Sequence, residues 1–318
     1  MADIANKRRI IFAGTPDFAV PYFNALGGDA DFEIIGVITQ PDKPSGRKQE
    51  LAPSPVKQAA SALGIKIFQP EKLTGNQGII SDIKKLSPDL LVVVAYGLII
   101  PQSMLDSFPQ GAINVHPSLL PKYRGASPIQ SAILNGEKTT GISIMLMDEK
   151  MDHGPLLAQR EVALTGEETN GSLHFQLAEL GSPLLLETII KYLAGNIKPQ
   201  EQNHDEATFC KIISKEDAQI DWQLPAQEIK QKIYAFYPWP ATWTTWDGKR
   251  IKIFPPVQVI DEGSDVKAGE VFLSDGRLAI KAGSGALIIN KLQLEGKKEV
   301  NAEEFVRGYS EIVGAVLK

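Results

Sequence analysis

The segment Arg-Ile-Ile-Phe-Ala-Gly-Thr-Pro at residues 9–16 decides the fold class. Its apolar run at 10–13 has no polar interruption, which is typical of a strand that is buried on both faces. Gly14, Thr15 and Pro16 end the strand, and the residues that follow predict a helix over 17–26. A buried strand that leads directly into a helix is the repeating unit of a parallel sheet covered by helices.

Further apolar runs alternate with helical patterns along the first part of the chain. The expected strands lie at 32–38, 65–68, 89–95, 111–115, 141–147 and 154–164, and further helices are expected at 53–63 and 172–193. We therefore predict an α/β fold with a Rossmann-like, mostly parallel sheet and helices on both faces. No Gly-x-Gly-x-x-Gly follows the first strand, so a dinucleotide site is not predicted.

The remainder of the chain has a different pattern. Residues 194–208 are polar, with Gly195 and Pro199, and are interpreted as a linker. Short strands are then expected at 251–254, 257–260, 269–273, 278–281 and 286–294. Several short strands in one block favour a small β-barrel. We therefore predict a catalytic domain at 1–193, a linker at 194–208 and a β-barrel domain at 209–318.

Polar side chains suited to acyl transfer gather around the strand expected at 111–115. Asn114 and His116 are two residues apart, so both side chains leave the same face of an extended segment. Asp152 lies in the expected turn between the next two strands. Acyl transfer needs hydrogen-bond donors for its oxyanion, a role open to Asn114 and to protonated His116, which could also act as a general acid. Asp152 could orient His116 or relay a proton from an attacking amine.

Each of these residues, taken alone, has an ordinary structural explanation. A histidine before a proline is typical of a loop, an aspartate two residues before a glycine is typical of a turn, and an asparagine at a strand end is often a cap. A catalytic role is favoured by the full string Asn-Val-His-Pro-Ser-Leu-Leu-Pro at 114–121, followed later by Asp152 and Gly154. This string resembles the motif of the folate-dependent formyltransferases. Asp148 is a weaker candidate than Asp152 because the matching glycine is absent.

Segments outside this motif resemble the methionyl-tRNA formyltransferases within that superfamily. They include Ile-Ile-Phe-Ala-Gly-Thr-Pro-Asp-Phe-Ala at 10–19, Gln-Pro-Asp-Lys-Pro-Ser-Gly-Arg at 40–47, Pro-Trp-Pro at 238–240 and Leu-Glu-Gly-Lys-Lys at 294–298. The resemblance extends from about Ile10 to Gly308. One departure follows Arg47, where the family often carries a basic run and this chain continues with Lys48, Gln49 and Glu50.

This resemblance implies a reaction and its participants. The formyl donor would be 10-formyltetrahydrofolate, and the acceptor would be the α-amino group of methionine on initiator Met-tRNA. Asn114, His116 and Asp152 would be the catalytic residues. The resemblance further implies that the C-terminal barrel is an open, oligonucleotide-binding type that contributes to tRNA binding. The remaining implied contacts are Ser118, Leu119, Leu120 and Pro121 for folate, and Lys43 and Arg47 for tRNA.

Composition is compatible with this interpretation but does not establish it. The net charge of −5 argues weakly against a nucleic-acid partner, although an RNA ligand needs only a locally positive track. The single cysteine, Cys210, excludes an intramolecular disulfide and favours a reducing compartment. The histidines lack metal-ligand spacing, and no apolar run is long enough for a membrane span. We expect a cytoplasmic monomer without a metal, a membrane or a DNA partner.

Two other functions are compatible with parts of the sequence. A formyltransferase that acts on a sugar-nucleotide amine, or that hydrolyses the formyl-folate, would use the same three catalytic residues. The loop at 40–47 and the tryptophan-rich second part argue against it. A non-catalytic RNA-binding protein on the same scaffold would not require Asn114, His116 and Asp152 together.

Overall fold

The computed structural model describes residues 7–45, 50–261 and 265–318. By its contacts, the chain divides into two compact units. Unit 1 comprises residues 1–128, 140–162 and 174–210, and unit 2 comprises 129–139, 163–173 and 211–318. Each unit is therefore assembled from three separate stretches of the sequence.

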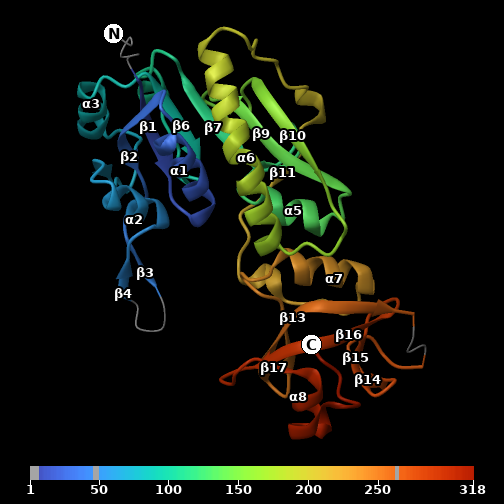
Figure 1. Ribbon diagram of the computed structural model, residues 1–318. Helices are drawn as coiled ribbons and strands as arrows, with labels where there is room; N and C mark the ends of the chain where they lie inside the picture. Colours follow the sequence, from blue (N-terminus) through green and yellow to red (C-terminus); the bar gives the residue numbers. More distant parts are fainter. Residues whose placement is uncertain (1–6, 46–49, 262–264) are drawn as a thin grey trace. The chain divides into compact units, whose positions relative to one another are not determined.

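A seven-stranded sheet organises unit 1, in the order β10-β9-β7-β6-β1-β2-β5 (Figure 1). Pairing is parallel from β7 through β6, β1 and β2 to β5, and antiparallel between β7 and β9. The strands are β1 (Arg8–Gly14), β2 (Phe32–Ile38), β5 (Ile67–Phe68), β6 (Leu90–Val94), β7 (Ala112–His116), β9 (Thr139–Leu146) and β10 (Leu156–Ala163). The predicted Rossmann-like, mostly parallel sheet is confirmed.

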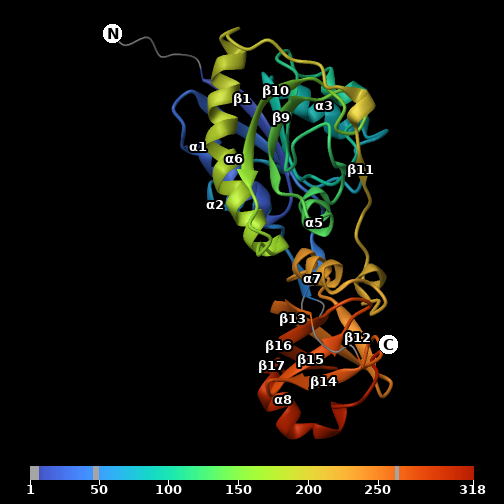
Figure 2. The same cartoon turned by 90° about the vertical axis from the view of Figure 1, so that its right-hand side faces the viewer.

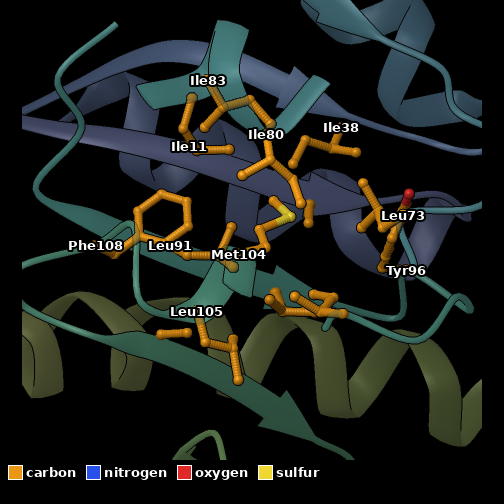
Figure 3. Close-up of a cluster of buried hydrophobic side chains, with 14 of the residues drawn as sticks. Ile11, Ile38, Leu73, Ile80, Ile83, Leu91, Tyr96, Met104, Leu105 and Phe108 are labelled. Atoms are coloured by element: carbon orange, nitrogen blue, oxygen red, sulfur yellow. The ribbon is translucent and has the colours of Figure 1, made fainter. Parts of the chain in front are cut away.

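Helices lie on both faces of this sheet because its central strands are apolar on both sides. Ile11 and Leu91 pack with Ile80 and Ile83 of α3 and with Met104 of α4 (Figure 3). On the other face, the Phe12 ring lies 5.5 Å from the Phe23 ring of α1. The helices of unit 1 are α1 (Val20–Gly28), α2 (Pro55–Ala62), α3 (Gln77–Lys85), α4 (Gln102–Leu105) and most of α6 (Asn170–Leu193). Helix α5 (Pro128–Leu134) belongs to unit 2 from Ile129 onward.

The ends of these elements differ slightly from the predicted ranges. The helix expected at 17–26 starts as a 3-10 turn, η1 (Asp17–Ala19), and becomes α1, with Pro21 in its first turn, where a missing N–H costs no helical bond. α2 begins after Ser54, whose hydroxyl accepts a hydrogen bond from the Lys57 N–H. The strand expected at 111–115 is β7 (Ala112–His116), so His116 is its last residue.

Two small sheets were not predicted. The loop after β2 contains the hairpin β3 (Lys43–Ser45) and β4 (Glu50–Ala52). The second is a parallel pair, β8 (Arg124–Gly125) with β11 (Phe209–Cys210). This pair connects the chain directly after the expected linker to the segment that follows β7.

Unit 2 contains an antiparallel sheet of order β12-β13-β16-β15-β14, with β17 paired to β16 (Figure 2). Helices α7 and α8 pack against it, and this curled sheet confirms the predicted open barrel. The strands expected at 251–254 and 257–260 form one strand with a register shift between Phe254 and Val257, because Pro255 and Pro256 lack N–H donors. The elements of unit 2 are α7 (Ala226–Ala235), β12 (Trp243–Trp246), β13 (Lys249–Ile260), β14 (Val271–Ser274), β15 (Arg277–Lys281), β16 (Ala286–Leu294), β17 (Val300–Asn301) and α8 (Ala302–Gly308), with 3-10 turns η3 (Glu216–Ala218) and η4 (Ser310–Ile312). A further 3-10 turn, η2 (His204–Glu206), belongs to unit 1.

Candidate active site

The three predicted catalytic side chains meet in unit 1. Asn114 and His116 project from the end of β7, and Asp152 lies in the turn between β9 and β10. The Nδ2 atom of Asn114 is 3.5 Å from Oδ1 of Asp152. Nδ1 of His116 is 3.6 Å from the same oxygen. An amide, an imidazole and a carboxylate therefore converge around a single atom.

The backbone around Asp152 explains how its carboxylate is aimed. Asp152 has a φ of 51°, in the left-handed region that L-residues seldom adopt. Gly154 tightens the same turn, since a Cβ there would lie 2.0 Å from the Leu146 carbonyl oxygen. The N–H of Gly125 donates to Oδ2 of Asp152 over 2.8 Å. One carboxylate oxygen is thus held by the backbone, which leaves Oδ1 facing Asn114 and His116.

The ring of His116 is held in one orientation. It is only 4% exposed, and its Nε2 lies 2.9 Å from the carbonyl oxygen of Tyr123. A carbonyl can only accept, so this contact requires the proton of a neutral ring to be on Nε2. Nδ1 then faces Asp152 with a lone pair, and it becomes a donor only when His116 is protonated.

Asp148, the weaker candidate, has a different partner. Its Oδ2 lies 2.6 Å from Nδ1 of His153. The ring of His153 in turn stacks on His204, with centroids 4.0 Å apart. This geometry favours Asp152 over Asp148 as the partner of His116.

The predicted folate-binding segment follows β7 directly. Ser118 and Leu120 are buried, whereas Leu119 and Pro121 are half-buried. The Ser118 hydroxyl donates to the Lys122 carbonyl over 2.7 Å. Ser143 fixes the same segment, because its Oγ accepts from the Leu120 N–H and donates to the Ser118 carbonyl. The assignment of these four residues to folate stays a prediction, and Ser143 was not anticipated.

Of the two predicted tRNA contacts, only Lys43 belongs to the described part of the chain. Lys43 is exposed on β3, and its Nζ donates to Oε1 of Gln40. Arg47 lies outside the described residues. The base of the hairpin is fixed by Asp42, which accepts from Lys57 and Gln69. Both contacts lower the pKa of the Asp42 carboxyl, with that to Lys57 the larger cause.

Several residues near the site were missed by the sequence reasoning. They are the buried Arg124 and Gln202, together with the backbone groups of Tyr123 and Gly125. Buried polar side chains in irregular segments follow no periodic pattern, so no sequence signal marked Arg124 or Gln202. Within residues 7–45, 50–261 and 265–318, no group of three or more metal-ligating side chains comes together. None of the helices in these ranges is long and apolar enough to cross a membrane.

Comparisons with known proteins give a consistent result. Residues 7–189 match the Formyl transferase family, and residues 212–310 match the Formyl transferase C-terminal domain. A methionyl-tRNA formyltransferase of Caldanaerobacter subterraneus is 42% identical over 98% of this chain and 100% of that protein. The enzyme of the same name from Bacillus velezensis is 41% identical over 97% of both chains.

One solved structure illustrates the fold similarity. HypX from Aquifex aeolicus, determined in complex with tetrahydrofolic acid, has a TM-score of 0.61 to this chain. The similarity covers 97% of this chain and 48% of that protein. At 17% sequence identity, this likeness shows the fold alone.

Proposed function

The chain belongs to the methionyl-tRNA formyltransferase family, and we propose that Asn114, His116 and Asp152 carry out its reaction. The enzyme transfers the formyl group of 10-formyltetrahydrofolate to the α-amino group of methionine on initiator Met-tRNA. The observation that supports the catalytic assignment is the meeting of Asn114 Nδ2 and His116 Nδ1 at one oxygen of Asp152. The close relatives argue against a sugar-nucleotide acceptor and against a binding protein without activity.

The amine of methionine attacks the formyl carbon, and the formyl oxygen becomes an oxyanion. The Asn114 amide donates to that oxygen without having to ionise. Protonated His116 donates from Nδ1, because its Nε2–H is already bonded to the Tyr123 carbonyl. These donors strengthen as charge develops, and a single such donor lowers the barrier by ~2.7–4 kcal/mol.

Proton movement completes the reaction. A bond forms between the amine nitrogen and the formyl carbon, and the bond from that carbon to N10 of the folate breaks. The amine loses a proton and N10 gains one, so the reaction is balanced without a metal or a redox partner. Asp152 serves the amine side, because Oδ1 faces the site while Oδ2 is held by Gly125.

The substrate contacts and the organisation of the chain complete the proposal. The folate is contacted by Ser118, Leu119, Leu120 and Pro121. The tRNA is contacted by Lys43 and Arg47. The bounds 1–193, 194–208 and 209–318 describe a catalytic domain, a linker and a tRNA-binding barrel. The protein acts as a monomer in the cytoplasm.

The experiment that tests this function is formyl transfer from 10-formyltetrahydrofolate to charged initiator Met-tRNA. Free methionine and charged elongator Met-tRNA serve as controls for the acceptor. Transfer confined to the initiator is expected. Turnover of the folate without a tRNA product would instead indicate a small-amine acceptor or hydrolysis.

A further inference from the structure

The segment expected to be a linker contributes a buried side chain to the turn that carries Asp152. Gln202 is only 5% exposed. Its Nε2 donates to the carbonyl of Asp152 over 2.9 Å and to that of Gly154 over 2.7 Å. Both amide protons are therefore used on the two carbonyls that flank His153, at the point where the backbone is left-handed.

Arg124 fixes the orientation of this amide. Nη2 and Nε of Arg124 lie 2.7 and 3.2 Å from Oε1 of Gln202. A guanidinium can only donate and a carbonyl can only accept, so the amide of Gln202 satisfies its neighbours in one orientation alone. Nη2 of Arg124 also donates to Nδ1 of His204 over 2.8 Å. The guanidinium of Arg124 therefore donates to two neutral side chains, Gln202 and His204.

The backbone holds this network at both ends. Leu156 of β10 and Gln200 exchange N–H···O bonds of 2.7 and 2.8 Å. Arg124 donates its N–H to the Thr208 carbonyl over 2.9 Å, directly before the pairing of β8 with β11. Segment 200–210 is thus attached to the strand after the turn and to the strand that holds Oδ2 of Asp152.

We propose that Gln202, oriented by Arg124, is a positioning residue that sets the place of Asp152 relative to Asn114 and His116. The inference rests on the proposed catalytic role of Asp152 and deepens it. Gly125 fixes one oxygen of the carboxylate, and Gln202 fixes the backbone from which the carboxylate projects. A displacement of ~1 Å at a reacting group can lower the rate ~100-fold, so a small shift of this turn is sufficient.

Two substitutions of Gln202 distinguish a role in positioning the turn of Asp152 from a role in anchoring Arg124 alone. Gln202→Met removes all hydrogen bonds at similar length. Gln202→Glu keeps the acceptor for Arg124 and adds an ion pair, but it presents oxygens to the two carbonyls of the turn. If Gln202 only anchored Arg124, the Glu variant would remain active. Asn203→Ala is the matched control, because this neighbouring exposed side chain bonds Glu206 and the Asp205 N–H and not the turn that carries Asp152.

Single-turnover formyl transfer to initiator Met-tRNA is measured for these variants, together with KM for both substrates and thermal unfolding. We expect Gln202→Met and Gln202→Glu each to lower the rate at saturation at least roughly 30-fold, with KM changed less than about threefold, since the turn acts on the transition state. The Asn203→Ala variant should stay within about twofold of the parent chain. A Gln202→Glu variant within about threefold of the parent rate would overturn the inference.

A double-mutant comparison distinguishes positioning from general damage and tests the two proposals separately. In an Asp152→Asn background, Gln202→Glu should lower the residual rate less than about threefold, because a residue that acts through Asp152 has nothing left to position. An equal loss of rate in the parent and Asp152→Asn backgrounds would show that Gln202→Glu causes damage unrelated to Asp152, and this would contradict the inference. An Asp152→Asn variant with the parent rate would instead refute the catalytic role of Asp152.

Discussion

Nδ1 of His116 lies 3.6 Å from Oδ1 of Asp152, and the side chains are 5% and 13% exposed. A backbone group fixes each side chain on the side away from its partner. The Tyr123 carbonyl accepts from Nε2 of His116, and the Gly125 N–H donates to Oδ2 of Asp152. The two groups cannot turn away from one another without losing these bonds. The pair is therefore preorganised, which is the property that makes fixed donors effective in catalysis.

The first prediction concerns the three converging side chains. Substitution of Asn114, His116 or Asp152 by alanine should each lower turnover at least roughly 100-fold, as expected for loss of an oxyanion donor or an acid–base group. The measurement is single-turnover transfer to initiator Met-tRNA. Asp148→Ala is the matched control because Asp148 faces His153, and it should stay within about tenfold of the parent. A near-parental rate in any of the three variants would remove that residue from the mechanism.

The second prediction concerns Gly154, which the turn requires for steric reasons. A Cβ at this position would lie 2.0 Å from the Leu146 carbonyl oxygen, so Gly154→Ala must displace the backbone next to Asp152. We expect a loss of ~1–3 kcal/mol in the free energy of unfolding and at least roughly a 10-fold loss of turnover. Urea unfolding and the transfer assay measure the two effects.

Gly28→Ala is the control for that experiment. Gly28 ends α1, and a Cβ there would have no atom within 4 Å apart from adjacent residues and the backbone of its own helix. It should leave turnover at the parental level and change stability by at most ~1 kcal/mol. Parental activity in Gly154→Ala would mean that the turn accommodates a side chain without moving Asp152.

The central sheet and the convergence of the three side chains could be predicted because both rest on strong local patterns. The apolar run at 10–13 indicates a buried strand wherever it occurs, and the two-residue spacing of Asn114 and His116 fixes their common face. The position of Asp152 beside these two side chains could be predicted because two adjacent strand patterns are joined by the turn that contains it. The pattern of apolar residues does not specify the order of the strands within the sheet.

The support behind Asp152 could not be predicted, because it depends on contacts between distant residues. Arg124 and Gln202 are separated by 78 positions and lie in segments without a helical or strand period. A polar, glycine- and proline-containing stretch favours an exposed linker, yet tertiary contacts bury Gln202 within it. The hairpin of β3 and β4 was missed for a related reason, since each strand has three residues and is too short to show alternation.

The third prediction concerns the tRNA contacts proposed from the sequence. Arg47→Ala should raise KM for initiator Met-tRNA roughly 10-fold or more, as expected for losing a charge-assisted hydrogen bond to phosphate. Lys43→Ala should weaken tRNA binding and reduce its salt dependence, because a phosphate contact releases counterions. Titration with tRNA at several salt concentrations, and with folate alone, measures both effects.

Lys85→Ala is the matched charge control for these variants. Lys85 is an exposed residue of α3 that pairs with Asp82, so its loss should leave tRNA affinity within about twofold. Equal weakening of folate and tRNA binding in Arg47→Ala would contradict a contact that is specific to tRNA.

The last prediction concerns the stability of unit 2 at low pH. Hydrogen bonds from Lys211 and from the Ser214 N–H lower the pKa of Asp217 to about 2, with Lys211 the larger cause. A pKa that is lower in the folded state than in the unfolded state stabilises the fold above about pH 4. This contribution is lost as the pH falls through the folded-state value. It amounts to at most about 1 kcal/mol, because Lys211 is largely exposed and solvent screens the pair.

Asp217→Asn should therefore lower the stability of unit 2 at pH 7, and the difference from the parent should shrink as the pH falls from 4 towards 2. Tryptophan fluorescence during urea unfolding is a direct probe, since all four tryptophans of the chain lie in unit 2. Asp261→Asn, at an exposed position of the same unit, is the control and should show no such trend. A difference that stays constant from pH 7 to pH 2.5 would show that the Asp217 side chain acts through its geometry and not through its charge.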